Sequence, residues 1–558
     1  MKFLQRFFFA REQKNSGVFF EKKHRSRYHP LSPVFYLLII SLVAITACQK
    51  SNNRADLIII NGAEPESLDP AIVTGQPDGR VVSELFEGLL RFNRKGEVEP
   101  GVDSSWKISA DQQTYTFYLR PDAKWSDGKD IRAQDFVNSW RRTLQPETGS
   151  AYSYQLFVVK GAEDFFTGKE KKFSKVGVSS LDDHTLQVTL AEPTLYFLYL
   201  CAYTTLFPVR IDLINRVGDN WVKPEEIICN GPYKLIEWRL NDKIRLERNP
   251  FYWDVANVHL KSIDLLPISQ PNVAYNFYAA GQADLSFAEV PLSLLHELKK
   301  GNDFHSAILL GVDFIRFNCT KVPCSDVRVR KALALCIDQK RIIKKLSDAI
   351  PAESFLPSGI AGYQPALGIG YNPQRARELL AEAGYPAGKD FPLTTYLYNE
   401  TEITEAIAVE LQAAWKKELG ISVLLAHQEW KVFLSSLKNR DYTLARSSWV
   451  GDYPDPNTFL DLFTSESGNN RTGWKSKTYD NLMQQASREL EPKKRFEFFQ
   501  QAEKILIDEE VPIVPLFFYT AIQLYDPKRL GGIEGNLLNR HPLREIYKIT
   551  KQYLLEKK

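Results

Sequence analysis

The chain has 558 residues, of which 44% are hydrophobic and 25% charged, as in ordinary folded proteins, and its length predicts two or three lobes rather than one compact core. Residues 1–47 hold eight of the 71 Lys and Arg residues and two of the 68 acidic residues, so the chain from Cys48 onward has a formal net charge of −3. Without a basic excess in that part, the composition argues against nucleic acid as a partner.

The first predicted element is a targeting segment. Residues 34–47 (VFYLLIISLVAITA) form a nearly apolar run, and Lys and Arg residues precede it between positions 22 and 27. A basic segment followed by an apolar run too short to span a bilayer comfortably is typical of a signal peptide. The run ends in ITAC at 45–48, which resembles the lipobox of bacterial lipoproteins, so Cys48 is the predicted lipidation site and residues 48–56 a lipidated tether. The alternative is a short signal anchor with an incidental Cys.

Residues 57–210 contain several patterned segments. Residues 57–60 (LIII) predict a buried strand that the Asn-Gly pair after them ends. Periodicity then predicts, in chain order, a helix over 81–90, a half-buried strand over 115–119, a helix over 133–144 and an alternating strand over 185–190.

Further elements are predicted in the second half of the chain. Asp326 is a good N-cap for a helix over 326–338, because its carboxylate can accept bonds from free amides of the first turn. Other predicted elements are a strand at 243–247 and helices at 374–384, 402–418 and 494–508. Strands that alternate with helices predict α/β lobes with mixed sheets.

Motifs of catalysis, metal binding or nucleotide binding are missing from the sequence. It has no Gly-x-Ser-x-Gly, P-loop, Gly-x-Gly-x-x-Gly or His-Glu-x-x-His pattern, and its eight His residues are scattered. The sequence therefore predicts neither an enzyme nor a metal or cofactor site. Five cysteines follow Cys48 with loose spacing, and only Cys319 and Cys324 lie close enough in sequence to suggest a small disulfide loop.

Four motifs point to a known family. They are GAEPESLDP at 62–70, WSDG at 125–128, CNGPYKLIEW at 229–238 and ARSSWVGDYPDP at 445–456. Together they resemble the oligopeptide-binding members of solute-binding protein family 5, the periplasmic proteins that serve peptide ABC transporters. The resemblance extends from about residue 57 to 545. The WSDG motif is interpreted as a tight turn with a buried indole rather than as a ligand contact.

The resemblance implies an α/β, two-lobed periplasmic-binding-protein-like fold of class II, with mixed sheets and an additional small domain. The resemblance also implies the divisions of the chain: lobe I comprises residues 57–86, 211–309 and 520–558, lobe II (the additional domain) 87–210, and lobe III 310–519.

The resemblance also implies a function. The protein is expected to be a monomer outside the cytoplasm, anchored to a membrane through lipid on Cys48, that captures oligopeptides in an interlobe cleft and delivers them to an ABC permease with separate ATPase subunits. Two alternatives stay open. The same fold can bind another solute, such as a dipeptide, muropeptide, glutathione, haem or nickel, or the chain can be a surface lipoprotein with an adhesin or chaperone role.

A peptide receptor that tolerates many sequences must recognise groups that all peptides share. Main-chain bonds to a ligand added as a strand provide this. By resemblance, residues 73–75 (with Thr74 and Gly75) and 448–450 (Ser448, Trp449, Val450) supply such edges, and Asp452 pairs with the α-ammonium of the ligand. Further expected contacts are Tyr152, Asn399, Phe314 and Trp430, the last with core packing as the alternative.

The carboxylate end of a ligand is less well defined by the sequence. Arg446 matches a family arginine that meets the C-terminus directly or through water. By resemblance, Thr404 falls where other members have a His, Leu437 falls near an Arg position with Lys438 adjacent, and Arg316 replaces an acid. These departures suggest a different preferred ligand length or an acidic ligand such as a muropeptide.

Overall fold

The computed structural model describes residues 54–343 and 348–550. The predicted signal peptide, Cys48 and most of the predicted tether lie outside the described residues. Within the described part, none of the helices has both the length and the apolar character that a membrane crossing requires.

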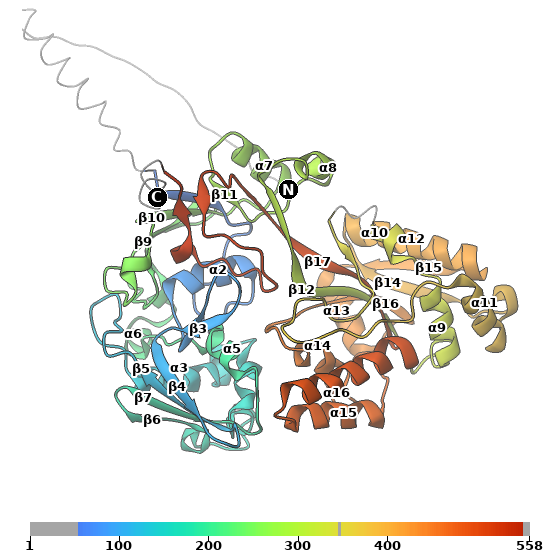
Figure 1. The fold of residues 1–558 in the computed structure, drawn as a ribbon, viewed down its shortest axis with the longest axis horizontal. Helices are drawn as coiled ribbons and strands as arrows, with labels where there is room; N and C mark the ends of the chain where they lie inside the picture. The colour runs from blue at the N-terminus through green and yellow to red at the C-terminus, as the bar shows by residue number, and fades with distance from the viewer. Residues whose placement is uncertain (1–53, 344–347, 551–558) are drawn as a thin grey trace, which may run out of the picture. The chain divides into compact units, whose positions relative to one another are not determined.

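The largest sheet of the described part is mixed and has eleven strands. Two long antiparallel strands, β12 and β17, lie side by side within it (Figure 1). Across the sheet the order is β15 (Val423–Gln428), β14 (Thr394–Asn399), β16 (Leu444–Val450), β12 (Phe304–Phe317), β17 (Ile513–Tyr525), β11 (Leu285–Ser286), β1 (Leu57–Ile60), β10 (Ser262–Leu266), β9 (Lys243–Arg248) and β8 (Tyr233–Arg239), with β13 (Ile350–Pro351) paired to β17.

The remaining strands form smaller antiparallel sheets. One has four strands in the order β4 (Asp103–Ile108), β5 (Thr114–Leu119), β7 (Thr185–Thr189) and β6 (Val178–Asp182). The others are the pairs β2 (Leu90–Phe92) with β3 (Val98–Pro100), and β18 (Leu530–Gly531) with β19 (Tyr547–Lys548). The four-stranded sheet lies within the range expected for lobe II.

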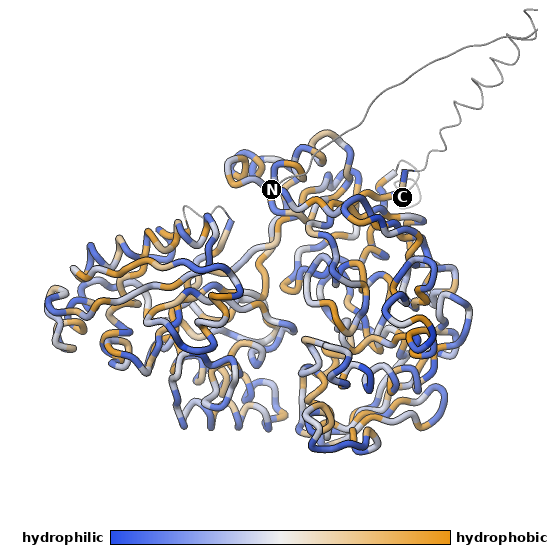
Figure 2. The backbone as a smooth tube through the Cα atoms, turned by 180° about the vertical axis from the view of Figure 1, so that it is seen from behind, coloured by the Kyte–Doolittle hydropathy of each residue, from blue (hydrophilic) through white to orange (hydrophobic). Residues whose placement is uncertain are grey.

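Helices accompany these sheets, and hydrophobic and hydrophilic residues are interspersed along most elements (Figure 2), as expected where one face of an element is buried. The α-helices are α2 (Gln76–Leu85), α3 (Ala133–Thr143), α4 (Ala162–Phe166), α5 (Phe197–Cys201), α6 (Ile211–Val217), α7 (Pro271–Ala279), α8 (Leu295–Leu298), α9 (Val327–Leu335), α10 (Gln339–Ile343), α11 (Pro373–Glu382), α12 (Glu402–Leu419), α13 (Trp430–Asn439), α14 (Asn457–Leu460), α15 (Lys477–Arg488) and α16 (Pro492–Lys504).

The large apolar cores divide along the chain. One cluster is built from buried residues between 57 and 285 and between 525 and 546, so it joins the ranges expected for lobes I and II. Two other clusters are built from buried residues between 310 and 518. The boundary between the two sets falls within β12 and β17, the strands that pass from one set of cores to the other. The individual lobe boundaries stay a prediction.

The ladder between these two strands is interrupted near that boundary. Their register shifts between Ile308 and Val312 of β12. Within the gap, the N–H of Leu310 donates to Leu537 O at 2.7 Å, and Leu310 O accepts from the N–H of Gly451 at 2.7 Å. A shift of this kind bends a strand and increases its twist. We therefore expect β12 and β17 to bend at this point if the two sets of cores rotate relative to each other.

Several local predictions are confirmed. β1 covers the predicted strand at 57–60, α12 covers the predicted helix at 402–418, and the side chain of Asp326 caps α9 by accepting from the N–H of Arg328. Trp125 is buried at 1% exposure in a turn closed by a 2.8 Å bond from the N–H of Gly128 to Trp125 O, as predicted for the WSDG motif.

The predicted helix at 81–90 is wrong at both ends. The observed helix, α2, starts earlier because the carboxylate of Asp78 accepts from the N–H of Gly75 at 3.2 Å and caps its first turn. It ends at Leu85, and the next residue, Phe86, is already extended. A Cβ at Gly88 would lie 2.4 Å from Cys201 O, so this glycine is required by a close backbone approach rather than by the helix.

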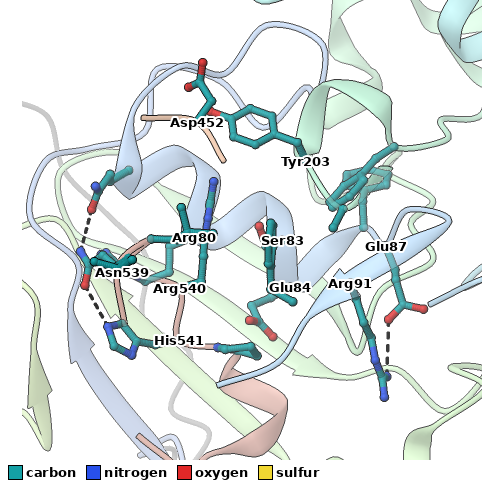
Figure 3. Close-up of a pocket in the computed structure, with 18 of the residues that line it drawn as sticks. Arg80, Ser83, Glu84, Glu87, Arg91, Tyr203, Asp452, Asn539, Arg540 and His541 are labelled. Carbon is teal, nitrogen blue, oxygen red and sulfur yellow. Dashed lines mark hydrogen bonds and ion pairs between the residues drawn. The ribbon is translucent and has the colours of Figure 1, made fainter. Parts of the chain in front are cut away.

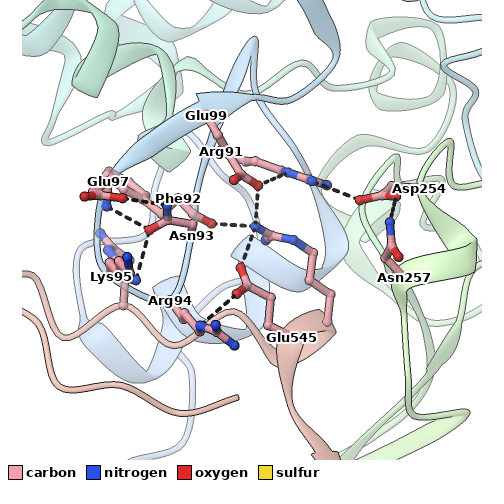
Figure 4. A network of polar contacts seen from close by, with 12 residues as sticks. Arg91, Phe92, Asn93, Arg94, Lys95, Glu97, Glu99, Asp254, Asn257 and Glu545 are labelled. Atoms are coloured by element: carbon pink, nitrogen blue, oxygen red, sulfur yellow. Dashed lines mark hydrogen bonds and ion pairs between the residues drawn. The ribbon is translucent and has the colours of Figure 1, made fainter. Parts of the chain in front are cut away.

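A network of charged residues fastens the β2–β3 hairpin to distant parts of the chain (Figure 4). The guanidinium of Arg91 pairs with Glu99 at 2.8 Å and with Asp254 at 2.9 Å. Arg544 adds a bond to Phe92 O and an ion pair with Glu99. Segments around residues 90, 254 and 544 are therefore held together by partly buried ion pairs.

The five described cysteines are free thiols, so the disulfide suggested for Cys319 and Cys324 is not formed. No group of His, Cys, Asp and Glu in the described residues is arranged to hold a metal ion.

Candidate ligand-binding site

Two neighbouring pockets make one groove. The first pocket, about 280 Å³, is lined by residues of α2, by Tyr152 and Tyr203, by residues 450–452 and by residues 537–544. The second, about 430 Å³, lies beside Arg446, the end of β14 and the middle of β17. Gln76, Leu309 and Asn539 line both pockets, so the pockets adjoin. Together they are called the groove below.

Strand β16 presents an unpaired edge between the two pockets. It pairs with β12 along its whole length but with β14 only at Leu444 and Ala445. Because Gly451 donates to β12 through its N–H, the alternation of an antiparallel ladder turns the backbone groups of Ser448 and Val450 away from β12. These groups form an edge to which an extended chain can add as a strand. Three predicted residues, Ser448, Trp449 and Val450, thus lie on one strand beside the groove.

Asp452 follows this strand directly and lines the first pocket. Its carboxylate accepts a 3.0 Å bond from the hydroxyl of Tyr154 and has no ion pair in the part of the chain that the structure describes. Burial raises the pKa of the Asp452 carboxyl, and the bond from Tyr154 and the positive charge of Arg540 reduce this effect. The pocket therefore holds a desolvated acid that a ligand ammonium would complement.

Aromatic rings surround this acid. The ring centroid of Tyr152 lies 5.6 Å from that of Tyr154 and 5.7 Å from that of Tyr203, and Figure 3 shows Tyr203 beside Asp452. Aromatic faces attract cations when water is excluded. The structure thus brings the predicted contact Tyr152 to Asp452, although the two residues are far apart in sequence.

At the other end of the groove, Arg446 is already compensated. Its guanidinium bonds to Asp313 at 2.5 and 2.8 Å, to the hydroxyl of Tyr519 at 2.7 Å and to the side-chain oxygen of Asn399 at 2.9 Å. Burial alone would lower the pKa of Arg446, but the charge of Asp313 raises it overall. Arg446 and Asn399 line the second pocket, yet this arginine does not offer an unpaired charge to a ligand C-terminus.

The first predicted edge, residues 73–75, divides in the structure. Thr74 lines the first pocket and Val73 is buried. Gly75 is the N-cap of α2, and its N–H is bonded to Asp78. Only Thr74 of the three therefore faces the groove. Thr404, noted for its lack of charge, lines the second pocket.

Several residues that the sequence placed near the ligand line neither pocket of the groove, among them Gly75, Ser448 and Trp449 described above. Phe314 is completely buried and packs edge-on against Phe355, so in this structure it belongs to a core. Arg316 is buried with its Nη1 donating to Asn469 O at 3.0 Å, which removes it as support for an acidic ligand. Trp430 lies exposed at the start of α13.

Sequence reasoning missed the basic residues of the first pocket. Arg80 comes from α2 and Arg540 from a loop near the C-terminus, and both line the pocket with Asp452 (Figure 3). Since single arginines in a helix and a loop form no pattern with Asp452 in the sequence, only the folded chain brings the three together.

Comparison with known proteins gives the family. The model described as "bacterial extracellular solute-binding proteins, family 5 Middle" matches residues 97–471. The chain belongs to this family. Its members are substrate-binding proteins of transport systems, and the two-lobed α/β fold expected from the four motifs is thereby confirmed. Family membership also places the protein outside the cytoplasm.

Individual relatives align with almost the whole of this chain. The periplasmic oligopeptide-binding protein OppA of Salmonella typhimurium is 37% identical over 90% of this chain and 93% of its own. The periplasmic murein peptide-binding protein MppA of Escherichia coli is 38% identical over 83% of this chain and 88% of its own. The crystal structure of a periplasmic oligopeptide-binding protein from Borrelia burgdorferi has a TM-score of 0.76 and 35% identity, and the match covers 89% of this chain and all of that one.

Proposed function

We propose that the protein captures oligopeptides in the groove and delivers them to an ABC import permease. The observation that carries this proposal is the continuity of β16 with Asp452: an unpaired strand edge leads directly to a half-buried acid that forms no ion pair with any described residue. A peptide added to the edge bonds through its main chain, whatever its side chains. Its α-ammonium then meets the carboxylate at the end of the strand. The relatives named for oligopeptide and murein peptide binding support the same ligand class.

Asp452→Asn tests this function. A charge-assisted bond contributes about 1.5–3 kcal/mol, and stranding one charge of a buried pair costs about 3–5 kcal/mol. We therefore expect the dissociation constant of Ala-Ala-Ala, measured by titration calorimetry, to rise about 100-fold in the variant. Blocking the amine should have the same effect, so N-acetyl-Ala-Ala-Ala should bind the unchanged protein as weakly as the free peptide binds the variant.

Glu466→Gln is the matched control, because the side chain of Glu466 is 91% exposed and lies outside the groove. It should leave the affinity unchanged. Equal affinity of Asp452→Asn and the unchanged protein for Ala-Ala-Ala would remove Asp452 from the site and with it the proposed orientation of the peptide.

Delivery to a permease requires that the ligand-bound form differ from the empty one. The crossing of β12 and β17, with its interrupted register, is the proposed hinge, and closure of the two sets of cores around the peptide is the proposed change. The permease would then recognise the closed form, while ATP binds to separate subunits. The chain is proposed to act as a monomer.

We further propose that the protein is a lipoprotein anchored through Cys48. The support is the sequence alone, an apolar run that ends in ITAC after a basic segment. Two or more acyl chains make membrane attachment stable. Cys48→Ala should move the protein, expressed with its full leader in a bacterium, from the detergent phase to the aqueous phase of a Triton X-114 extraction. Equal partitioning of the two forms would argue for a signal anchor instead.

A further inference from the structure

The first pocket contains a positive charge that has no role in the peptide binding proposed here. The guanidinium of Arg80 donates to the backbone oxygen of Asn61 at 3.2 Å and to its side-chain oxygen at 2.6 Å, and lies 3.9 Å from the ring centroid of Phe287. All of these contacts are neutral. Among the described residues, no carboxylate forms an ion pair with Arg80, so its charge is not balanced locally.

Arg540 is a second such charge and lies on a rigid backbone. Its N–H donates to the side-chain oxygen of Asn536 at 3.1 Å, and its carbonyl accepts from the amide of the same side chain at 2.7 Å. The Arg540 guanidinium lies 5.3 Å from the ring centroid of Tyr203, a residue of the pocket wall. It likewise has no ion pair in residues 54–343 and 348–550, so a fixed loop directs an unpaired cation toward the pocket.

These two cations repel each other. Burial and the charge of Arg540 lower the pKa of Arg80 to about 9, which leaves Arg80 charged at neutral pH. The acid one turn along α2, Glu84, does not compensate them, because burial raises its pKa to about 8 and keeps it protonated. Two like charges in a partly desolvated pocket are unfavourable unless an anion joins them.

Of the other charged residues that line this pocket, Glu87, Arg91 and Arg544 form ion pairs of their own, which leaves Asp452. Its carboxylate feels the charge of Arg540, but it lies beyond ion-pair distance and bonds to Tyr154. When a ligand ammonium pairs with Asp452, Arg540 keeps its own charge unmatched. Arg446 cannot take over this role, since Asp313 neutralises it at the far end of the groove.

We propose that Arg540, supported by Arg80, is a subsite for a ligand carboxylate close to the amine that Asp452 holds. This inference rests on the proposed function. Arg540 and Asp452 line one pocket of about 280 Å³, and an extended residue spans about 3.3–3.6 Å. Because both residues line the same pocket, we assign the carboxylate to the first or second residue of the ligand. It can be an acidic side chain, or the C-terminal carboxylate of a dipeptide.

Three pairs of ligands distinguish these sources in titration calorimetry. Asp-Ala-Ala against Asn-Ala-Ala tests an acidic first residue, and Ala-Glu-Ala against Ala-Gln-Ala tests an acidic second residue. Ala-Ala against its C-terminal amide tests the carboxylate of a dipeptide. Each pair differs only by a carboxylate that becomes an amide, so the ratio of dissociation constants within a pair isolates the contribution of the negative charge.

We expect the acidic member of at least one pair to bind about tenfold or more tightly than its amide partner, because a charge-assisted pair with a guanidinium is stronger than a neutral bond. In Arg540→Gln this ratio should fall below about threefold. Arg540→Lys should keep part of it, since lysine retains the charge and loses the planar fork. Arg488→Gln, in the exposed last turn of α15, is the matched control and should keep the full ratio.

The outcomes separate this inference from the proposed function. If Ala-Ala-Ala binding depends on Asp452 and every ratio in the unchanged protein is below about threefold, the carboxylate subsite is refuted and the peptide function stands. A ratio that persists in Arg540→Gln also refutes the carboxylate subsite. The melting temperature of the variant, if equal to that of the parent, shows that the variant is folded. If no peptide depends on Asp452, the proposed function itself fails.

Discussion

At the scale of single residues, the groove contains a charged group whose burial is unfavourable until a ligand of opposite charge binds. Asp452 is a half-buried acid whose polar partner is a tyrosine hydroxyl, and Arg446 is a cation already matched by Asp313. Removing a charge from water costs free energy unless a partner compensates it. Burial therefore disfavours the ionised form of Asp452 in the empty site and raises the pKa of its carboxyl, and a bound ammonium favours the ionised form again.

This residue predicts how peptide affinity depends on pH. Burial raises the pKa of Asp452 in the empty protein, whereas a bound ammonium must lower it. Protons thus compete with the peptide, and affinity is full above the raised pKa and lost as the pH falls through it. Below that point the dissociation constant of Ala-Ala-Ala should rise by up to about tenfold per pH unit. Calorimetry between pH 4 and 7 covers the range in which the amine of the peptide stays protonated.

Asp452→Asn provides the control for this pH profile. Its affinity should be weak and nearly independent of pH, because the amide does not titrate. A slope that persists in the variant would assign the proton to another group of the groove. The same variant should melt no lower than the parent without peptide, since it removes a desolvated charge.

At the scale of elements, the segment after β16 is fixed by a buried ion pair. Asp455 and Arg495 form two parallel bonds, from Nη1 at 2.6 Å and from Nη2 at 2.8 Å, and both side chains are nearly inaccessible. Arg495 projects from α16, so the pair ties the segment that carries Asp452 to a long helix. Geometry of this kind is strong and directional.

Breaking this pair should destabilise the protein. Asp455→Ala leaves Arg495 buried without a partner, and we expect the free energy of unfolding in urea to fall by about 3–5 kcal/mol. Glu466→Ala, at an exposed ion pair of the same region, should change it by less than about 0.5 kcal/mol.

The double variant Asp455→Ala with Arg495→Ala gives the internal check. It should lose less than the sum of the two single variants, because the second change removes the stranded charge. Additive losses would mean that the two residues stabilise the protein separately and that the pair does not anchor the segment.

At the scale of the whole molecule, a stacked pair of tyrosines joins the range expected for lobe II to that expected for lobe III. The rings of Tyr196 and Tyr453 are 4.1 Å apart between centroids and nearly parallel, at 3°. Tyr453 is the residue after Asp452, so this contact lies next to the proposed amine site. A contact between segments that move relative to each other would report on closure.

A double-mutant cycle of Tyr196→Ala and Tyr453→Ala tests whether the stacked pair of tyrosines forms on closure. Aromatic pairs contribute about 0.5–1.5 kcal/mol beyond their buried area. If the stack forms only in the closed, peptide-bound state, the coupling energy appears in the affinity for Ala-Ala-Ala, as up to about a tenfold effect. The alternative result, coupling in the melting temperature of the empty protein and none in affinity, would show that the contact is permanent and that closure occurs elsewhere.

The sequence by itself determined the elements whose signals are local. The run at 57–60, the cap at Asp326 and the glycine turn after Trp125 depend on residues next to one another, and all three formed as expected. The four motifs determined the family, and Asp452 could be singled out because it lies inside one of them. The helix predicted at 81–90 was wrong at both ends: α2 ends at Leu85, and Gly88 lies against the backbone of Cys201, which is remote in sequence.

Only the tertiary structure decided which charges face the groove. Arg446 and Arg316 look equally available in the sequence, yet one is neutralised by Asp313 and the other is buried away from both pockets. Arg540 stands 88 residues after Asp452 and enters the same pocket because the chain returns there after β17. Charges act through space and burial, which no local pattern encodes. The pairing of charges across the fold therefore had to be read from the folded chain.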